Sequence, residues 1–357
     1  MDTRQQPRET MRALQLTGPG TLELREIPIP EIGPGELLLR VGAAGICHSD
    51  SYVLSLPFAM REDPLTMGHE IAGTIEAVGP EVAGRTAGER GIVYLCWSCG
   101  VCRECARGRE NVCLAAGRTA MPPCPGLGPD GGMAEYVAIP ANSFVPIHDD
   151  LDFAEAAPLA DAALTPYHAI RGTMDQLQPG STAVAIGIGG LGHVAVQILS
   201  AVTAARVIAV DIAQDKLDLA AECGAELGLL ATDETAARIL ELTGGRGAEA
   251  VFDFVGTDST AALAVQAVAP DGAYRMVGLG GGAPGIDAAP AGGPGLPWGA
   301  TVRKSYAGTR SDLYASVALA QRGRVRVEVE RFALEEGRAA FDHLDRGEIR
   351  GRAVLIP

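Results

Sequence analysis

The chain has 357 residues, 47% of them hydrophobic and 20% charged, so it can bury full cores, and its length favours two domains. The net charge of −15 would repel a phosphate backbone, which argues against nucleic acid as a partner. Gly, Asp or Arg interrupts the apolar runs before they reach the roughly 18 residues that span a bilayer, so we do not expect membrane insertion.

The first segment of the chain, residues 1–10, is polar, and we expect a flexible tail there. It lacks the basic and apolar regions of a secretory signal, which favours the reducing cytoplasm. Short β-type runs separated by Gly and Pro then predict a β-rich first domain up to about residue 150. The expected strands are residues 12–16, 22–27, 36–43, 71–78, 91–95 and 134–139.

Single ligand-type residues occur at two places in this β-rich region, Cys47 and His69. Each alone is more often structural, but together they suit zinc, and a catalytic zinc keeps three protein ligands and one open position. Asp161 lies in an apolar surround shortly before the second domain and is a candidate third ligand. A buried acid at that place needs a metal or a partner.

A cluster of four cysteines lies between these candidates: Cys99, Cys102, Cys105 and Cys113. Thiolates at this spacing can meet one ion at about 2.3 Å and leave no position for water, which predicts a structural zinc. Chance clustering and two disulfides of an exported protein are the alternatives, and neither fits the expected reducing location well. Three further cysteines, Cys96, Cys124 and Cys223, stand outside the spacing and are interpreted as ordinary thiols.

From about residue 154, helical stretches alternate with apolar strands, which predicts a parallel sheet. The expected elements are strands at 182–186, 206–210, 250–254 and 273–277, with helices at 190–204, 214–223 and 259–268. Residues 280–299 have the composition of a linker but contain apolar anchors such as Trp298. The last expected elements are structured chain at 301–306, helices at 312–321 and 335–346, and strands at 325–329 and 352–356.

A glycine pattern follows the strand 182–186 directly: Gly187, Ile188, Gly189, Gly190, Leu191 and Gly192. Between a strand and a helix this pattern indicates a pyrophosphate site at the helix N-terminus. Asp211 lies nineteen residues later, where a carboxylate binds ribose hydroxyls and favours NAD over NADP, although a helix cap is the alternative. Lys216, one of two lysines, either reaches the same ribose or is a solvated helix charge.

Taken together, the chain after Met11 resembles the zinc-dependent medium-chain alcohol dehydrogenases, most closely the bacterial NAD-dependent secondary-alcohol dehydrogenases. The residues that carry the resemblance to the family are Cys47 with Ser49, Gly68, His69, Glu70, Gly73, Gly79, Val82, the cysteine cluster and the glycine pattern. The likeness to the bacterial secondary-alcohol dehydrogenases is carried by residues 158–169, 308–313 and 349–352. The resemblance implies an α/β protein with a GroES-like catalytic domain at 11–162 and 301–357. It also implies a Rossmann-type doubly wound NAD-binding domain at 163–300.

The resemblance also implies two zinc ions per subunit and assigns roles around the catalytic one. Its ligands would be Cys47, His69 and Asp161, with Glu70 as an alternate ligand. Asp50 would hold the other nitrogen of His69. The remaining implied residues are Ser49 in proton relay, His48 at the pyrophosphate, and Val255, Val277 and Leu279 at the nicotinamide.

One position departs from the resemblance. Many relatives have a relay histidine five residues after the zinc cysteine, and this chain has Tyr52 there. We expect Tyr52 to line the substrate pocket instead, with Trp97, Leu127, Tyr306 and Ala307.

The expected activity is therefore NAD-dependent conversion of small alcohols, preferably secondary ones, to ketones or aldehydes by a cytoplasmic homodimer or homotetramer. A polyol dehydrogenase on the same scaffold is the alternative. A non-catalytic NAD-binding protein is a further one, and the complete set of Cys47, His69, Asp161 and Ser49 argues against it.

Overall fold

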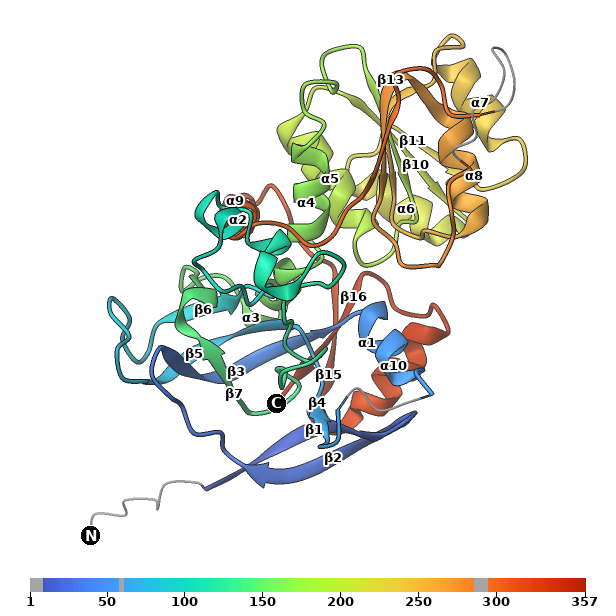
Figure 1. Ribbon diagram of the computed structural model, residues 1–357. Helices are drawn as coiled ribbons and strands as arrows, with labels where there is room; N and C mark the ends of the chain where they lie inside the picture. The colour runs from blue at the N-terminus through green and yellow to red at the C-terminus, as the bar shows by residue number, and fades with distance from the viewer. Residues whose placement is uncertain (1–8, 58–60, 286–294) are drawn as a thin grey trace. The chain divides into compact units, whose positions relative to one another are not determined.

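The structure is a computed structural model that describes residues 9–57, 61–285 and 295–357 (Figure 1). The chain divides into two compact units. The β unit comprises Met1–Asp161 and Glu328–Pro357, and the α/β unit comprises Ala162–Val327. Most of the expected N-terminal tail and part of the 280–299 segment lie outside the described residues. The first strand already begins at Thr10.

The β unit is built on two sheets. A small sheet has the order β2-β1-β4, with β1 (Thr10–Gly18), β2 (Thr21–Pro28) and β4 (Leu65–Thr66). The larger sheet has the order β15-β16-β3-β5-β6-β8, and β7 also pairs with β3. Its strands are β3 (Glu36–Ile46), β5 (Glu70–Val78), β6 (Arg90–Val93), β7 (Tyr136–Pro140), β8 (Phe144–Pro146), β15 (Val329–Ala333) and β16 (Arg352–Ile356).

Strand β3 lies in the middle of the larger sheet and organises its core. Apolar side chains alternate inward along its first half, so Leu37, Leu39 and Val41 are buried with Ile71 and Phe144. Short helices fill the connections of the unit: α1 (His48–Leu54), α2 (Arg103–Ala106), α3 (Phe153–Ala156), α10 (Gly337–Asp345), η1 (Glu110–Val112), η2 (Leu114–Ala116), η3 (Ala141–Ser143), η4 (Ala157–Ala160) and η5 (Leu334–Glu336).

The α/β unit contains one parallel sheet of the order β11-β10-β9-β12-β13-β14. Its strands are β9 (Thr182–Ile186), β10 (Arg206–Asp211), β11 (Leu227–Leu230), β12 (Ala248–Asp253), β13 (Val268–Met276) and β14 (Thr301–Lys304). The first strand in sequence is central and fully buried, and the chain winds outward from it in both directions. This is the strand order of the expected Rossmann-type fold, which is confirmed.

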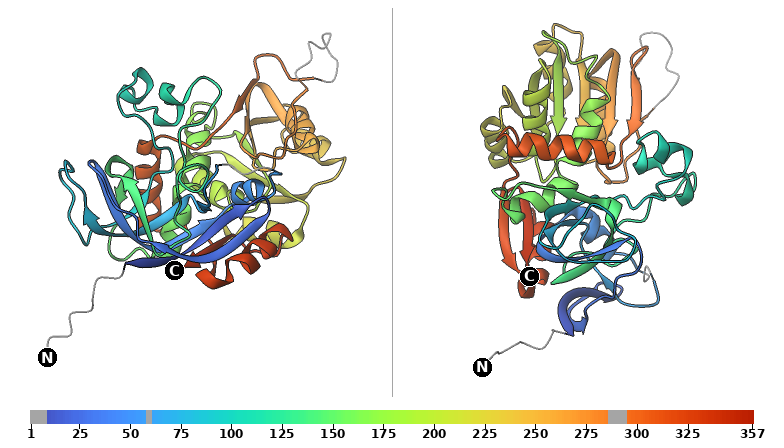
Figure 2. Two further views of the ribbon diagram at one scale, coloured as in Figure 1. Left: turned by 60° about the horizontal axis from the view of Figure 1, so that its bottom comes forward. Right: turned by 90° about the vertical axis from the view of Figure 1, so that its left-hand side faces the viewer.

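Helices cover both faces of this sheet, with α5 and α8 on opposite sides in Figure 1. The strands stand side by side in the right-hand view of Figure 2. The helices are α4 (Leu164–Arg171), α5 (Gly192–Val202), α6 (Gln214–Glu222), α7 (Thr235–Leu242), α8 (Asp258–Ala267) and α9 (Arg310–Gln321). In the described part of the chain, no helix has the length and hydropathy to cross a bilayer.

One expected strand is wrong in position. The sequence favoured a strand at 325–329, but β15 begins at Val329 and continues to Ala333. Val325 and Val327 are buried without belonging to a strand. Pairing decides the position, because Val329 lies opposite Arg352 of β16. Sequence analysis also missed the edge strand β11, whose leucines are half-buried or exposed, and the short helix α7, which buries only Thr235, Ala236 and Ile239.

Candidate active site

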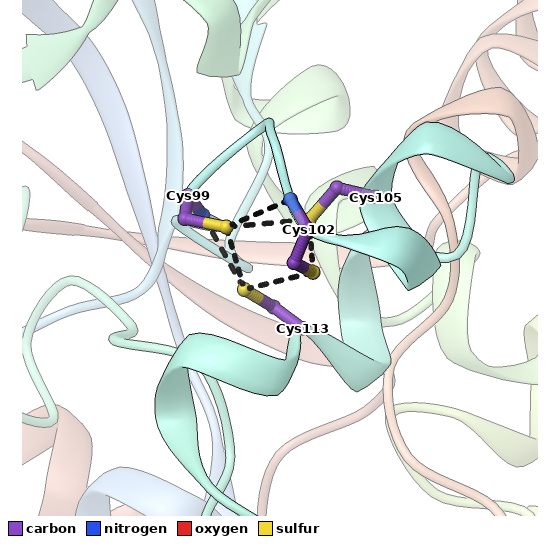
Figure 3. A group of neighbouring side chains, drawn as sticks. All are labelled: Cys99, Cys102, Cys105 and Cys113. Carbon is purple, nitrogen blue, oxygen red and sulfur yellow. Dashed lines mark hydrogen bonds between the residues drawn. The ribbon is translucent and has the colours of Figure 1, made fainter.

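The four clustered cysteines form one compact group of free thiols (Figure 3). Neighbouring Sγ atoms are 3.5 Å apart for Cys99–Cys113 and Cys102–Cys105, and 4.0 Å apart for Cys99–Cys105 and Cys102–Cys113. Four sulfurs around a tetrahedral zinc at about 2.3 Å would be about 3.8 Å apart. The group therefore has the size and the donor chemistry of a closed zinc site.

Backbone amides around this group point at the sulfurs. The N–H groups of Cys102, Leu114 and Cys99 each donate to a cysteine Sγ over 3.4 Å. Hydrogen bonds from the amides of Cys105 and Leu114 lower the pKa of Cys102 to about 6, and burial raises the pKa of Cys105 to about 12. Amides that favour a thiolate prepare the loop for a cation, because zinc binds the deprotonated sulfur.

A second group brings together three residues from distant parts of the β unit: Cys47, His69 and Asp161. Cys47 Sγ lies 3.4 Å from Asp161 Oδ2, and His69 Nε2 lies 3.8 Å from the same oxygen. One sulfur, one imidazole nitrogen and one carboxylate oxygen suit zinc, and three ligands leave a position open. The geometry is that of a catalytic rather than a structural metal site.

Local structure positions each of the three residues. Cys47 directly follows β3 and is the N-cap of α1, His69 immediately precedes β5, and Asp161 follows η4. Asp50 ties the first two together. Its Oδ2 accepts from the Cys47 backbone N–H over 2.9 Å, and its Oδ1 lies 3.1 Å from His69 Nδ1. This contact leaves His69 Nε2 to face the group, as a metal-binding imidazole requires.

The surroundings of His69 favour a positive charge. Burial alone lowers the pKa of the ring, but Asp50, Asp161 and Cys47 together raise the pKa well above the ordinary histidine value. These neighbouring groups therefore stabilise a positive charge at the imidazole ring. A divalent metal between Cys47 and Asp161 would supply that charge in place of a proton.

A buried ion pair lies next to this group and was not predicted from sequence. Arg352, at the start of β16, donates from Nε to both carboxylate oxygens of Glu70 over 3.0–3.1 Å and from Nη2 to Glu70 Oε1. Its Nη2 also donates to Asp161 Oδ2 over 3.1 Å. Glu70 itself is outside the three-residue group. Burial raises the pKa of Glu70 even though Arg352 acts in the opposite direction.

Helix α1 carries, besides Asp50, the expected site residues His48, Ser49 and Tyr52. Ser49 lies in the first turn, with its Oγ 3.6 Å from Cys47 Sγ. Cys47 occupies the N-cap, and Ser49 is the second residue of the helix. His48 is exposed, and Tyr52 has 60% of its surface accessible. Their side chains are thus available to a ligand.

The other expected pocket residues belong to different parts of the chain. Trp97 and Leu127 are half-buried and pack against the core of the β unit. The indole N–H of Trp97 is buried and has no hydrogen-bond partner within the described residues. In the α/β unit, Tyr306 is half-buried, and Ala307 is buried with a φ of +43°.

The glycine pattern forms the turn between β9 and α5. Gly187 has a φ of +86°, which favours glycine, and a Cβ on Gly192 would lie 1.9 Å from the Gly187 carbonyl oxygen. A Cβ on Gly189 would meet nothing within 4 Å, so this side of the turn is open. Gly190 and Leu191 complete the turn before α5 begins at Gly192. The helix N-terminus can therefore receive an anion.

Asp211 ends β10 beside this turn. Its Oδ2 accepts from the Ile188 N–H over 2.6 Å, and its Oδ1 accepts from the Ala213 N–H over 3.2 Å. It thus joins the strand end to the glycine turn. Lys216 follows in the first turn of α6, and its Nζ lies 4.0 Å from Asp215 Oδ2.

The three residues expected at the nicotinamide lie on the loops after β12 and β13. The Gly280 N–H donates to the Val255 carbonyl over 3.0 Å, which joins the two loops. Val255 and Leu279 are exposed, and Val277 is buried. A Cβ on Gly187 would lie 2.4 Å from Val255 Cγ2. The carboxyl ends of four neighbouring strands therefore carry the expected cofactor residues, as in other doubly wound sheets.

Known proteins are similar to this chain in both sequence and fold. Residues 33–149 match the profile of the alcohol dehydrogenase GroES-like domain, and residues 190–322 match that of the zinc-binding dehydrogenases. An NAD-dependent alcohol dehydrogenase of Sulfurisphaera tokodaii is 35% identical over 97% of this chain and all of its own length. The chain belongs to the zinc-dependent medium-chain alcohol dehydrogenases.

Solved structures of the family superpose on the chain along its length. The alcohol dehydrogenase of Aeropyrum pernix matches with a TM-score of 0.86 and 32% identity, over 97% of this chain and all of its own. Acetophenone reductase from Geotrichum candidum, solved in complex with NAD, matches with a TM-score of 0.83 and 31% identity, over 99% of this chain and 98% of its own. The GroES-like and Rossmann-type folds expected from sequence are confirmed.

Proposed function

We propose that the protein oxidises small alcohols with NAD, preferentially secondary alcohols to ketones, and catalyses the reverse reduction. The convergence of Cys47, His69 and Asp161 into one three-ligand group with an open position supports this most directly. These residues are proposed to hold the catalytic zinc, and the four clustered cysteines the structural zinc. The β unit is accordingly the proposed catalytic domain, and the α/β unit the NAD-binding domain.

The bound groups supply the reactive chemistry: zinc lowers the pKa of the substrate hydroxyl, and the nicotinamide of NAD accepts the hydride. The chain supplies proton transfer and orientation. Ser49, whose Oγ lies 3.6 Å from Cys47 Sγ, would accept the hydroxyl proton while it passes its own proton toward the cofactor ribose, because a serine hydroxyl can accept and donate in the same relay. Asp50 fixes the tautomer of His69 through the 3.1 Å contact to Nδ1.

The proposed cofactor site follows the carboxyl ends of the strands in the α/β unit. The pyrophosphate would lie at the N-terminus of α5, where free N–H groups and the helix dipole offset the acidity of the whole chain. His48 is proposed to contact the same phosphates. Asp211 would accept from the adenosine ribose with Lys216 nearby, and backbone groups at Val255, Val277 and Leu279 would meet the nicotinamide.

The preference for secondary alcohols is supported by the likeness to a reductase whose name specifies a ketone, acetophenone. We propose that Tyr52, Trp97, Leu127, Tyr306 and Ala307 form the pocket. We expect secondary alcohols such as 1-phenylethanol to give a kcat/KM at least about tenfold above that of primary alcohols and polyols, a difference of about 1.4 kcal/mol. Initial NADH formation across a panel of alcohols measures this. Turnover of polyols alone would contradict it.

We also propose that the protein is a cytoplasmic homo-oligomer, a homodimer or a homotetramer. The eight cysteines are all free, which suits a reducing compartment. Strand β14 ends the parallel sheet, and among the described strands none pairs with its outer edge. Trp298, three residues before β14, is 83% exposed. An open strand edge beside a large apolar side chain suits pairing with a second copy.

Replacement of Trp298 by aspartate tests this interface. We expect the change to weaken self-association at least about tenfold, because it places a charge where an apolar contact forms. Light scattering after size-exclusion chromatography, over a dilution series, measures the mass. Leu24→Asp, at an exposed apolar side chain of β2, is the control and should leave the mass unchanged. A wild-type protein that is monomeric at all concentrations would refute the assembly.

A further inference from the structure

Arg352 is a fully buried guanidinium that contacts two carboxylates at the proposed metal site. Its side chain is 2% exposed, and that of Glu70 is not exposed at all. Both oxygens of Glu70 accept from Arg352, and Asp161 Oδ2 accepts from Arg352 Nη2 over 3.1 Å. One cation thus holds two acids that lie 91 positions apart in the sequence.

Three neighbouring strands fix this arrangement. Strand β3 pairs with β16 on one side and with β5 on the other, so Gly45 lies opposite both Val354 and Glu70. A Cβ on Gly45 would lie 2.0 Å from Glu70 Oε2. Glycine at this position therefore makes the room in which the Glu70 carboxylate meets Arg352. The sheet therefore sets the geometry of the Arg352–Glu70 pair, and Asp161 reaches it from the end of η4.

The two carboxylates differ in how many of their oxygens accept a hydrogen bond from Arg352. Asp161 Oδ2, which accepts from Arg352, is also the oxygen that faces Cys47 Sγ at 3.4 Å and His69 Nε2 at 3.8 Å. Glu70, in contrast, has both oxygens engaged by Arg352. Arg352 therefore holds the Asp161 carboxylate facing Cys47 and His69, and it binds both oxygens of the Glu70 carboxylate.

We propose that Arg352 is a positioning residue of the catalytic zinc site: it holds Asp161 Oδ2 toward Cys47 and His69 and holds Glu70 off the metal. The inference rests on the proposed function, because it takes Asp161 as a zinc ligand. A carboxylate ligand makes this role possible, since it can accept a charge-assisted hydrogen bond and bind a metal at once. Stability alone does not account for the arrangement, because a buried ion pair adds little against well-packed apolar residues.

The test uses the full chain with zinc in the cysteine cluster and Co²⁺ at the three-residue group. In Arg352→Met we expect Co²⁺ to leave to a chelator about 10–100 times faster, the usual cost of losing an outer partner of a metal ligand. The visible d–d absorption of Co²⁺ should also weaken as the released Glu70 adds a ligand. Arg352→Lys keeps the charge without the planar fork, so its release rate should be intermediate.

Arg331→Met is the matched control. Arg331 also pairs with an aspartate of the β unit, over 2.8 Å to Asp152, but on the surface. Its loss should change neither the cobalt spectrum nor the release rate. A wild-type spectrum and release rate in Arg352→Met would overturn the inference.

Two further variants avoid leaving a buried charge unpaired. Glu70→Gln keeps an oxygen acceptor for Arg352, and its cobalt spectrum should match the wild type; an altered spectrum would show that Glu70 is a ligand and overturn the inference. The double variant Glu70→Gln/Arg352→Met removes both charges. It should release Co²⁺ at least as fast as Arg352→Met, because it lacks the added Glu70 ligand, and its spectrum should not show that ligand; wild-type release would overturn the inference.

Asp161→Ala separates this inference from the proposed function. Loss of Co²⁺ from Asp161→Ala, with normal retention in Arg352→Met and in Glu70→Gln/Arg352→Met, would refute only the role of Arg352. Full retention of Co²⁺ in Asp161→Ala would refute the three-ligand site itself, and the proposed function with it.

Discussion

Replacement of Cys47 by alanine is expected to abolish alcohol oxidation while leaving NAD binding intact. Cys47 supplies the only sulfur in the three-residue group, so its loss leaves His69 and Asp161, too few ligands to hold a catalytic zinc. The loss of kcat should exceed the roughly 10–100-fold that removal of an outer partner of a metal ligand causes. NADH formation measures turnover, and NADH fluorescence titration measures cofactor binding.

Metal content separates the two zinc sites in the same experiment. The wild type should contain two zinc ions per chain, and Cys47→Ala should contain one, because the cysteine cluster is unaffected. Cys223→Ala is the matched control, since Cys223 belongs to neither group and follows α6 in the other unit. It should keep two zinc ions and full activity. Wild-type turnover in Cys47→Ala would refute the catalytic assignment.

Replacement of Asp211 by glycine is expected to shift the cofactor preference toward NADP. The wild-type carboxylate repels a 2′-phosphate, and its removal leaves Lys216 as the nearby charge that can pair with one. We expect the ratio of kcat/KM for NADP to that for NAD to rise at least about tenfold, which corresponds to about 1.4 kcal/mol. Initial rates with each cofactor at saturating alcohol measure the ratio.

Asp211 has a second contact that the experiment must separate from ribose binding. Its Oδ2 accepts from the Ile188 N–H in the glycine turn, so glycine at 211 also loosens the pyrophosphate site. Asp211→Asn keeps an acceptor for this N–H while removing the charge, and it should show part of the shift without a large loss of NAD turnover. Asp218→Asn removes an exposed charge further along α6 while keeping an acceptor for Gln214 Nε2, and it should change nothing. An unchanged cofactor ratio in both Asp211 variants would count against the ribose contact.

The sequence by itself was sufficient to predict a feature when all the residues that form it lie close together in the chain. The four clustered cysteines lie within fifteen positions, so a single loop can turn all their sulfurs inward. The glycine pattern likewise lies between one strand and one helix, and its turn needs only local backbone freedom. Periodicity identified the parallel sheet for the same reason, because each strand and helix carries its own apolar pattern.

Features set by pairing between distant segments were less predictable. The expected strand at 325–329 was wrong because β15 takes its position from β16. The residue types of Cys47, His69 and Asp161 made them candidate zinc ligands, and the resemblance to a family then assigned them to one site. Only the structure brings their ligand atoms to within 4.8 Å of one another.

The tertiary structure alone revealed the contacts of Arg352. Residues 349–352 contribute to the resemblance, but Arg352 lies 282 positions from Glu70 and 191 from Asp161, and its sequence neighbours did not indicate that it pairs with them. Pairing of β16 with β3, and of β3 with β5, carries it into the buried site. The sequence thus determined the class of fold, the cofactor turn and the closed metal loop, because these are local. The open metal site and the buried Arg352 beside it were decided by the tertiary structure, because strand pairing and the position of η4 bring together residues that are far apart in the chain.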